Sequence, residues 1–282
     1  MAIHIVTDST ACLPQGYAEE HGITVIPLKV SLDGEYFRDG IDIANDEFYR
    51  RLVAGATAGS TQPSPEEFAS AYRAILDKDP GGDIISVHIS SRMSGTLNSA
   101  LTGRNQLDTV HVRFVDSWNA ALGVGFPVMR AVELAEAGVP LWQVVAEVEA
   151  LCLRTHTYFV LDSLKYLERG GRIAKAAAIA ASILKIKPVL TYIEGVTDVV
   201  DRPRTKKVAL EHLWAIIDKH VQKGVEYVGF HYAANRVELE SFQREFTSRY
   251  NLPSMLTQLG PVVGTYSGPD MIGVVITEKK PQ

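Results

Sequence analysis

The sequence has few cysteines and no long apolar run. Its two cysteines, Cys12 and Cys152, are far apart and belong to no C-x-x-C pattern, which excludes a disulfide scaffold and a zinc site of the usual cysteine spacing. The longest apolar stretch, 176–184, is interrupted by Ser182, and a membrane helix needs roughly 20 apolar residues. The sequence therefore predicts no membrane-spanning helix and no stable membrane insertion.

The chain also lacks an excess of basic residues and a leader-like start. It has 33 acidic and 28 basic residues and a net charge of -5, which disfavours binding to nucleic acid, where a basic surface must replace the counterions of the phosphates. Residues 1–10 (MAIHIVTDST) have neither the basic start nor the apolar middle of a signal peptide. We expect a cytoplasmic protein.

The motifs of several enzyme classes are missing. The chain has no G-x-G-x-x-G, no Walker loop and no G-x-S-x-G elbow, so nucleotide sites of those kinds and an α/β-hydrolase centre have no support. An S-x-x-K match at Ser182–Lys185 stands without the partner motifs of its class, so we interpret it as chance. The eight histidines are scattered, which predicts no metal site, and His88 is expected in the core.

What the sequence does contain is an alternation of strands and helices. Strand-like runs at 3–7, 84–89 and 110–115 alternate with helical segments, which predicts an α/β fold with a mostly parallel open sheet flanked by helices. Asp33-Gly34 indicates a hairpin, and Ser64-Pro65-Glu66-Glu67 indicates a capped helix start. A helix is expected over 118–137, with a bend or break near Pro127.

The second half of the chain has a different pattern. Strands are expected at 157–160, 189–193, 197–200, 227–231 and 271–277, with a hairpin at Glu194-Gly195, and helices at 174–186, 205–220 and 235–250. This order predicts an α/β domain with antiparallel character. We therefore expect two domains, residues 1–160 with a small β-hairpin insertion near 24–40, and residues 161–282.

Hydroxyl side chains cluster where the expected strands end, at 8–10, 60–64, 90–96 and 116–117. Ligands of open α/β sheets bind at these strand ends, although such residues also serve as caps and turns, which is our interpretation of Asp8 and Asp116. The 90–96 segment offers hydroxyls and amide groups to an anion at a helix start. Because no partner activates a nucleophile there, the pattern favours binding over catalysis.

Two further segments have two interpretations each. Glu168-Arg169-Gly170-Gly171-Arg172 precedes an alanine-rich run, which is either a closely packed helix or a helix that leaves room for a long apolar ligand. The cluster formed by Arg202, Arg204, Lys206 and Lys207 is either a solvated helix start or a docking patch for an acidic or phosphate-bearing partner.

Taken together, these segments resemble the DegV family of bacterial fatty-acid-binding proteins, the lipid-carrying subunits of fatty acid kinase. The resemblance is carried, in order, by segments 6–10, 60–63, 89–96, 167–173, 187–190, 204–207 and 260–264. It implies a long-chain fatty acid with a buried tail, no cofactor and no catalysis by this chain. It also implies that a separate ATP-dependent kinase subunit phosphorylates the bound carboxylate to an acyl-phosphate in phospholipid metabolism.

Carried over residue by residue, the resemblance predicts both a carboxylate site and a docking surface. The carboxylate-binding groups are Ser60, Thr61, Ser91, Ser94, Gly95, Thr96 and Tyr266. The residues facing the kinase or its phosphate are Arg172, Arg202, Arg204, Lys206 and Lys207. Tyr266 departs from the family, which often has histidine at this position. A tyrosine donates a hydrogen bond but supplies no cation near neutral pH.

Two other classes of function compete with this interpretation. One is a small-molecule hydrolase that uses a serine of the 90–96 segment, with His88 as the base. On a strand His88 shares a face with Ser90 only, which is poor geometry for a triad. The other is a module without a ligand, in which the alanine-rich helix is tightly packed and the hydroxyls are caps.

Overall fold

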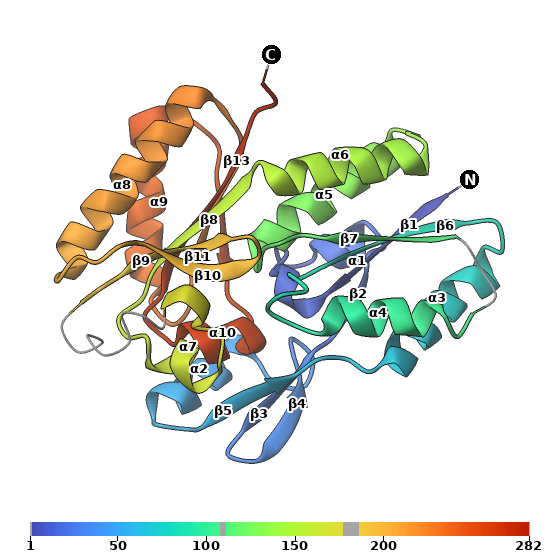
Figure 1. The fold of residues 1–282 in the computed structure, drawn as a ribbon, viewed down its shortest axis with the longest axis horizontal. Helices are drawn as coiled ribbons and strands as arrows, with labels where there is room; N and C mark the ends of the chain where they lie inside the picture. The colour runs from blue at the N-terminus through green and yellow to red at the C-terminus, as the bar shows by residue number, and fades with distance from the viewer. Residues whose placement is uncertain (1, 108–110, 177–185, 282) are drawn as a thin grey trace.

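The computed structural model describes residues 2–107, 111–176 and 186–281. The S-x-x-K match and most of the alanine-rich run lie outside these residues. Figure 1 shows two large sheets beside each other and a small sheet below them. No helix among the described residues is both long enough and apolar enough to cross a membrane.

The first large sheet is wholly parallel, as the sequence predicts. Its strand order is β2 (Thr24–Ile26), β1 (Ile3–Asp8), β6 (Asp83–His88) and β7 (Val112–Asp116). Helices α3 (Pro65–Lys78) and α4 (Thr96–Arg104) cover one face, while α5 (Leu122–Glu136) and α6 (Leu141–Leu153) cover the other. Both faces are apolar because consecutive residues point to opposite sides, so Val6 packs with α3 and Ile5 with α5 and α6.

The second large sheet is mixed, which confirms the antiparallel character expected there. Its order is β10 (Val196–Asp201), β9 (Val189–Ile193), β8 (Thr155–Val160), β13 (Ile272–Glu278), β11 (Val225–Tyr232) and β12 (Met255–Gln258), and only the β11–β12 pair is parallel. Helices α8 (Lys206–Lys223) and α9 (Arg236–Tyr250) cover one face with Leu213, Ile217 and Phe246. The boundary between residues 160 and 161 stays a prediction.

Helix α5 packs between the two large sheets. Val124 and Val128 face the parallel sheet, whereas Leu122 and Phe126 face the mixed sheet. The approach is close at Gly229 of β11, where a Cβ atom would lie 2.4 Å from Leu122 Cδ1. A single helix thus fixes the relative position of the sheets.

The start of α5 differs from the sequence prediction. The helix begins at Leu122 and not at 118, because Trp118 and Ala121 have positive φ angles of 55° and 56°. It continues without a break through Pro127. The Leu122 amide donates to His231 Nε2 over 2.9 Å, so a side chain of β11 caps the helix.

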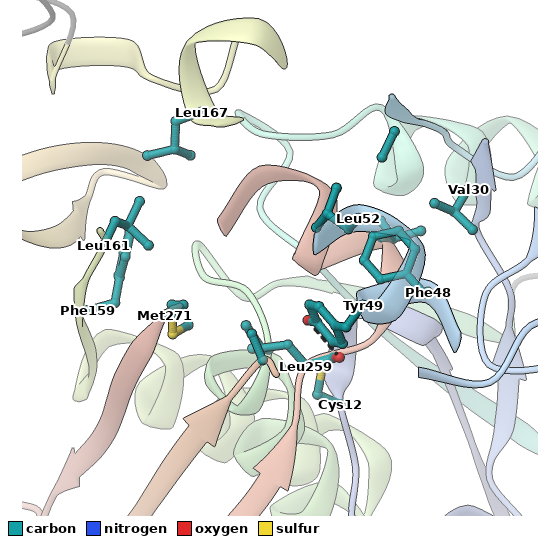
Figure 2. Packing of buried hydrophobic residues seen from close by; sticks show 14 of the residues in the cluster. Cys12, Val30, Phe48, Tyr49, Leu52, Phe159, Leu161, Leu167, Leu259 and Met271 are labelled. Carbon is teal, nitrogen blue, oxygen red and sulfur yellow. Dashed lines mark hydrogen bonds between the residues drawn. The ribbon is translucent and has the colours of Figure 1, made fainter. Parts of the chain in front are cut away.

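The small antiparallel sheet has the order β4 (Glu35–Arg38), β3 (Lys29–Leu32) and β5 (Ala58–Thr61). Asp33 and Gly34 join β3 and β4 with φ angles of 52° and 89°, the type I′ geometry expected for this hairpin. Helices α2 (Asn45–Val53), α7 (Lys165–Arg169) and α10 (Pro261–Ser267) contribute to the same core. Figure 2 shows this core, in which Phe48, Tyr49 and Leu52 of α2 meet Leu259 before α10.

The remaining short elements follow β1. The 3-10 turn η1 (Ser9–Ala11) begins directly after the strand, and α1 (Tyr17–Glu20) lies between it and β2. Asp8 caps η1 by accepting a hydrogen bond from the Thr10 amide, as the sequence predicts. These elements connect β1 to β2 within the parallel sheet, and β3 of the small sheet follows β2 directly.

Candidate functional site

A cavity of about 380 Å³ lies where the three sheets meet, and we call it the central cavity. The carboxyl end of the parallel sheet supplies Thr10, Ile89 and Ser94. The mixed sheet supplies Phe159, Tyr192 and Thr197, and β5, α7 and α10 supply the remaining sides. The cavity therefore lies at strand ends of an open α/β sheet, which is the usual ligand position in such folds.

Part of the lining of the central cavity is apolar. It is formed by Leu28, Ile89, Met93, Ala120, Phe159, Leu167, Val262, Val263 and Met271. Figure 2 shows that Phe159, Leu167 and Met271 lie on the side of the core away from Val30 and Phe48. The wall is thus a continuation of the hydrophobic core. An apolar ligand segment there would lose its contact with water.

The polar part of the lining includes three side chains that contact one another. Tyr266 of α10 and Ser60 of β5 share a hydrogen bond of 2.6 Å between their hydroxyls. The Arg172 guanidinium stacks over the Tyr266 ring, 5.2 Å from its centroid. Backbone carbonyls hold this guanidinium, because Nε donates to Met93 over 3.0 Å and Nη1 donates to Gly170 over 2.8 Å.

Gly170 allows the Tyr266 ring to approach. A Cβ atom on this residue would lie 2.4 Å from two ring carbons of Tyr266, which is far inside van der Waals contact. The glycine of the Glu168–Arg172 segment therefore has a packing role in the site. It places the tyrosine between the arginine and Ser60.

A second polar group comes from the turn after β6. Ser94 Oγ is 2.8 Å from Thr96 Oγ1 and accepts a hydrogen bond from the Thr96 amide over 3.3 Å. Gln62 lies directly against Gly95, where a Cβ atom would be 2.1 Å from Gln62 Oε1, and its Nε2 donates to Ser99. Ser94, Thr61 and Gln62 therefore line the cavity together.

The described lining of the central cavity carries positive charge and no negative charge. Arg172 is the only ionised side chain among the described lining residues, and the others are apolar, hydroxyl or amide groups. Burial raises the pKa of Tyr192, so this phenol is neutral at physiological pH. An anion with an apolar tail matches such a cavity, because hydroxyl donors and a guanidinium stabilise negative charge.

Of the predicted carboxylate-binding residues, the structure brings Ser60, Thr61, Ser94 and Tyr266 to the central cavity. Thr96 is buried behind Ser94, and Gly95 caps α4 without lining the cavity. Ser91 is exposed, and its amide bonds the carboxylate of Asp116. Asp116 therefore has the structural role that the sequence analysis assigned to it. All seven residues stay predictions as carboxylate ligands.

The predicted basic residues separate into two groups. Arg172 lines the central cavity, whereas Arg202, Arg204, Lys206 and Lys207 lie at the start of α8 and do not line it. Lys206 Nζ donates to Glu238 Oε2 over 2.7 Å. Within the described chain, the side chains of Arg202, Arg204 and Lys207 are exposed and have no hydrogen-bond or ion-pair partner.

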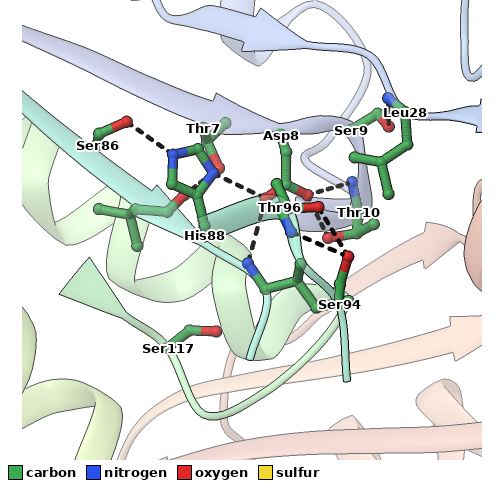
Figure 3. A network of polar contacts seen from close by, with 12 residues as sticks. Thr7, Asp8, Ser9, Thr10, Leu28, Ser86, His88, Ser94, Thr96 and Ser117 are labelled. Atoms are coloured by element: carbon green, nitrogen blue, oxygen red, sulfur yellow. Dashed lines mark hydrogen bonds and ion pairs between the residues drawn. The ribbon is translucent and has the colours of Figure 1, made fainter. Parts of the chain in front are cut away.

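His88 is part of a buried polar network and not of a catalytic pair with Ser90, Ser91 or Ser94. Its ring bonds Asp8 Oδ2 over 2.9 Å and Ser86 Oγ over 2.7 Å, and all three side chains are fully buried (Figure 3). The Ser86 hydroxyl is also 2.8 Å from that of Tyr72. This arrangement joins β1 to β6 and gives the hydrolase hypothesis no support.

The sequence analysis missed several lining residues. Gln62 and Thr10 stood inside motifs that were noticed, but neither was predicted to bind a ligand. Phe159, Tyr192 and Met271 gave no signal at all, because apolar residues on buried strands have the same pattern whether they fill a core or line a cavity.

A second cavity of about 520 Å³ lies beyond η1 and is lined by Asp8, Cys12 and Asp39. Burial raises the pKa of Asp39 to about 7, so its carboxyl is partly ionised near neutral pH. Asp39 Oδ1 accepts a hydrogen bond from the Val262 amide, and no described residue bonds Oδ2. Carboxylates in the lining disfavour an anion, so the central cavity is the better anion site.

Known proteins are similar to this chain over nearly its whole length. The family model described as "Uncharacterised protein, DegV family" matches residues 2–279. A DegV domain-containing protein of Caldanaerobacter subterraneus is 33% identical over 282 residues, which covers 98% of this chain and 99% of that protein. A DegV domain-containing protein of Streptomyces coelicolor is 32% identical, with 98% and 99% covered.

Solved structures with the same fold include two described as fatty acid binding. A DegV family protein from Thermus thermophilus matches with a TM-score of 0.91 and 34% identity, covering 99% of this chain and 100% of that one. DegV of Bacillus subtilis matches with a TM-score of 0.91 and 30% identity, with the same coverage. A stearic acid-binding protein from Eubacterium ventriosum has a TM-score of 0.88 and 28% identity, covering 98% of each chain.

Proposed function

Because the chain belongs to the DegV family, we propose that it binds a long-chain fatty acid in the central cavity and presents its carboxylate to a separate kinase. The observation that carries the proposal is the lining of this cavity, which combines apolar side chains with hydroxyl groups and Arg172. A fatty acid has the same two parts, an apolar tail and a polar head. The fatty-acid binding described for the Thermus and Bacillus proteins supports the assignment.

The tail supplies most of the affinity in this proposal. Burying about 15 methylene groups at roughly 0.8 kcal/mol each gives a gross gain of about 12 kcal/mol. Each hydrogen bond to a charged carboxylate adds about 1.5–3 kcal/mol before its desolvation is counted. The apolar wall therefore determines how tightly the ligand binds, and the hydroxyls determine where its carboxylate lies.

The polar side offers several donors to that carboxylate. In the hydrogen bond between Ser60 and Tyr266 one hydroxyl donates to the other, so the hydroxyl that accepts still has its own proton to donate to a bound carboxylate. Thr61 at the end of β5 and Ser94 in the turn after β6 also line the cavity. Arg172 supplies the positive charge that a tyrosine in place of the family histidine does not.

A neighbouring polar cavity supports transfer of a phosphoryl group at this head. It has a volume of about 200 Å³ and is lined by Arg92, Arg172 and Thr197, of which Arg172 and Thr197 also line the central cavity. Two guanidinium groups beside a carboxylate suit the added negative charge of an acyl-phosphate. In this proposal the chain needs no cofactor of its own, because the kinase brings ATP.

Ser94, the cavity serine that a hydrolase of this chain would use, has no general base among the described residues as its hydrogen-bond partner. The Ser94 hydroxyl is bonded to Thr96 and not to a general base. The proposal is therefore a carrier and not an enzyme. The exposed cations Arg202, Arg204 and Lys207 are the proposed docking surface for the kinase.

The test combines ligand binding with phosphorylation. The Ser94→Ala/Thr61→Ala double variant should keep the fold and much of the lipid affinity, because the tail is untouched, but lower acyl-phosphate formation by a cognate kinase. A matched control is Ser70→Ala, which changes an exposed serine of α3 outside the cavity. Unchanged phosphorylation of the double variant would sink the carboxylate assignment, and a protein that takes up no fatty acid would sink the proposal as a whole.

A further inference from the structure

Three potential metal ligands meet on the mixed sheet, and none of the three lines the central cavity. His156 of β8 pairs with Ile276 of β13, so Glu278, two residues further on, points to the same face as His156. Helix α8 packs on that face and brings His220 between them. The ligand atoms of the three side chains all lie within 4.8 Å of one another.

The three side chains are in contact with one another, and their ligand atoms are slightly closer together or further apart than in a metal site. His220 Nδ1 is 2.7 Å from Glu278 Oε1, and the centroids of the two imidazole rings are 4.9 Å apart. Donor atoms of a tetrahedral zinc site lie about 3.4 Å apart, given bonds of about 2.0–2.2 Å. An ion therefore fits after shifts of less than about 1 Å, which side-chain torsions supply.

The surroundings also supply an outer contact. The Tyr158 hydroxyl is 3.0 Å from His220 Nε2 and can accept as well as donate a hydrogen bond. When Nδ1 binds a metal, Nε2 carries the proton and donates to Tyr158, which fixes the ring as second contacts of metal-bound histidines do.

We propose that His156, His220 and Glu278 bind a divalent transition-metal ion, with Zn²⁺ as the best match to two imidazoles and one carboxylate. The fourth position is taken by water. Such an ion cross-links β8, α8 and β13 and stabilises the mixed sheet. No local sequence pattern predicts this site, because the three residues are separated by 58 or more positions.

Lys223 competes with a metal ion for the Glu278 carboxylate. Its Nζ lies 2.8 Å from the same Glu278 oxygen, and 63% of its side chain is exposed. Because the side chain is exposed and long, it can leave the carboxylate when a metal binds. Its charge nevertheless repels a cation, so Lys223→Ala should tighten metal binding.

The experiment measures binding of Zn²⁺ to the full chain by calorimetry, and the visible absorption of bound Co²⁺. We expect one saturable site, tetrahedral Co²⁺ bands and a melting temperature that rises with Zn²⁺. His156→Ala should weaken Zn²⁺ binding at least about tenfold, and Lys223→Ala should strengthen it. His212→Ala is the matched control, because His212 is a half-buried histidine of the same helix and pairs with Asp201.

Glu278→Gln keeps the size of the side chain and serves if His156→Ala does not fold. It too should weaken Zn²⁺ binding at least about tenfold. The proposal is overturned if wild type shows no saturable Zn²⁺ site, or if His156→Ala and Glu278→Gln bind Zn²⁺ as tightly as wild type does. Loss of binding in His212→Ala equal to that in His156→Ala also overturns it.

Discussion

Tyr266→Phe removes one hydroxyl from the polar side of the central cavity and leaves the shape of the ring unchanged. In the structure this hydroxyl is 2.6 Å from Ser60 Oγ, and the ring lies under Arg172. The ring keeps its stacking and its close contact with Gly170 in the variant. The change therefore isolates the contribution of one hydrogen bond.

The expected loss follows from the charge of the ligand. A hydrogen bond to a carboxylate contributes about 1.5–3 kcal/mol, which corresponds to a dissociation constant about 10- to 150-fold higher for the fatty acid. The corresponding fatty alcohol makes only a neutral hydrogen bond, which is about half as strong. The preference for acid over alcohol should therefore fall in the variant.

The assay is a titration of both ligands against wild type, Tyr266→Phe and the control Tyr166→Phe. Tyr166 lies against Gly268, close to α10, but does not line the cavity. The control should keep the wild-type preference for the acid. Equal losses for acid and alcohol, or no loss for the acid, would refute a role of Tyr266 at the carboxylate.

Three other predictions concern the packing, the acid stability and the docking surface. Gly170→Ala should weaken fatty-acid binding, because its Cβ atom displaces the Tyr266 ring, and the same titration measures this loss. Burial lowers the pKa of His231 to about 3, so the native state resists the proton that the unfolded chain takes up below pH 6.5. The contribution of neutral His231 to the free energy of unfolding is therefore fully present above pH 6.5 and is lost by up to about 1.4 kcal/mol per pH unit below it. Urea unfolding at several pH values should show a smaller slope in His231→Gln. Reversing the charges of Arg204 and Lys207 to Glu should weaken coupling to the kinase while the lipid stays bound, as phosphorylation and binding assays on one sample would show.

Each of these predictions has a control. Gly81→Ala should leave binding unchanged, because nothing lies within 4 Å of its Cβ position. An acid slope in His231→Gln as steep as in wild type would contradict the lowered pKa of His231 as its cause. For the docking surface, Arg73→Glu on α3 is the matched charge reversal, and equal loss of lipid and kinase coupling in the double variant argues against docking.

Features of the fold that depend on neighbouring residues in the chain were predictable from the sequence. The capping box of Ser64 and Glu67 and the type I′ hairpin at Asp33-Gly34 both form as expected, because each is complete within four residues. The hairpin at Glu194-Gly195 follows the same rule, with φ angles of 51° and 73°. Local chemistry is enough to determine such elements.

Strand β5 was not predicted, because its sequence Ala58-Gly59-Ser60-Thr61 has little β propensity. It is a strand because β3 offers a free edge, to which all four residues pair. Tertiary pairing therefore determines this element. The consequence extends to the site, since β5 carries Ser60 and Thr61 to the central cavity.

The candidate site was predictable in part. The sequence shows the hydroxyl clusters at 60–64 and 90–96, and the resemblance to the DegV family assigns Ser60, Thr61 and Ser94 to the carboxylate, but the contact of Ser60 with Tyr266 joins residues 206 positions apart. A sequence pattern extends over a few neighbouring residues, so it cannot predict a contact between residues so far apart in the chain. The apolar wall was not predictable either, because Phe159 and Met271 differ from core residues only in facing a cavity.

Native mass spectrometry of the purified protein, followed by denaturation and organic extraction, tests the carrier function most directly. A buried acyl chain should remain bound through purification, because its tail contributes about 12 kcal/mol of gross burial energy. We predict a mass increment of one fatty acid per chain that extracts as free fatty acid. A mass equal to that of the chain alone, with no uptake of added fatty acid, would contradict the carrier function.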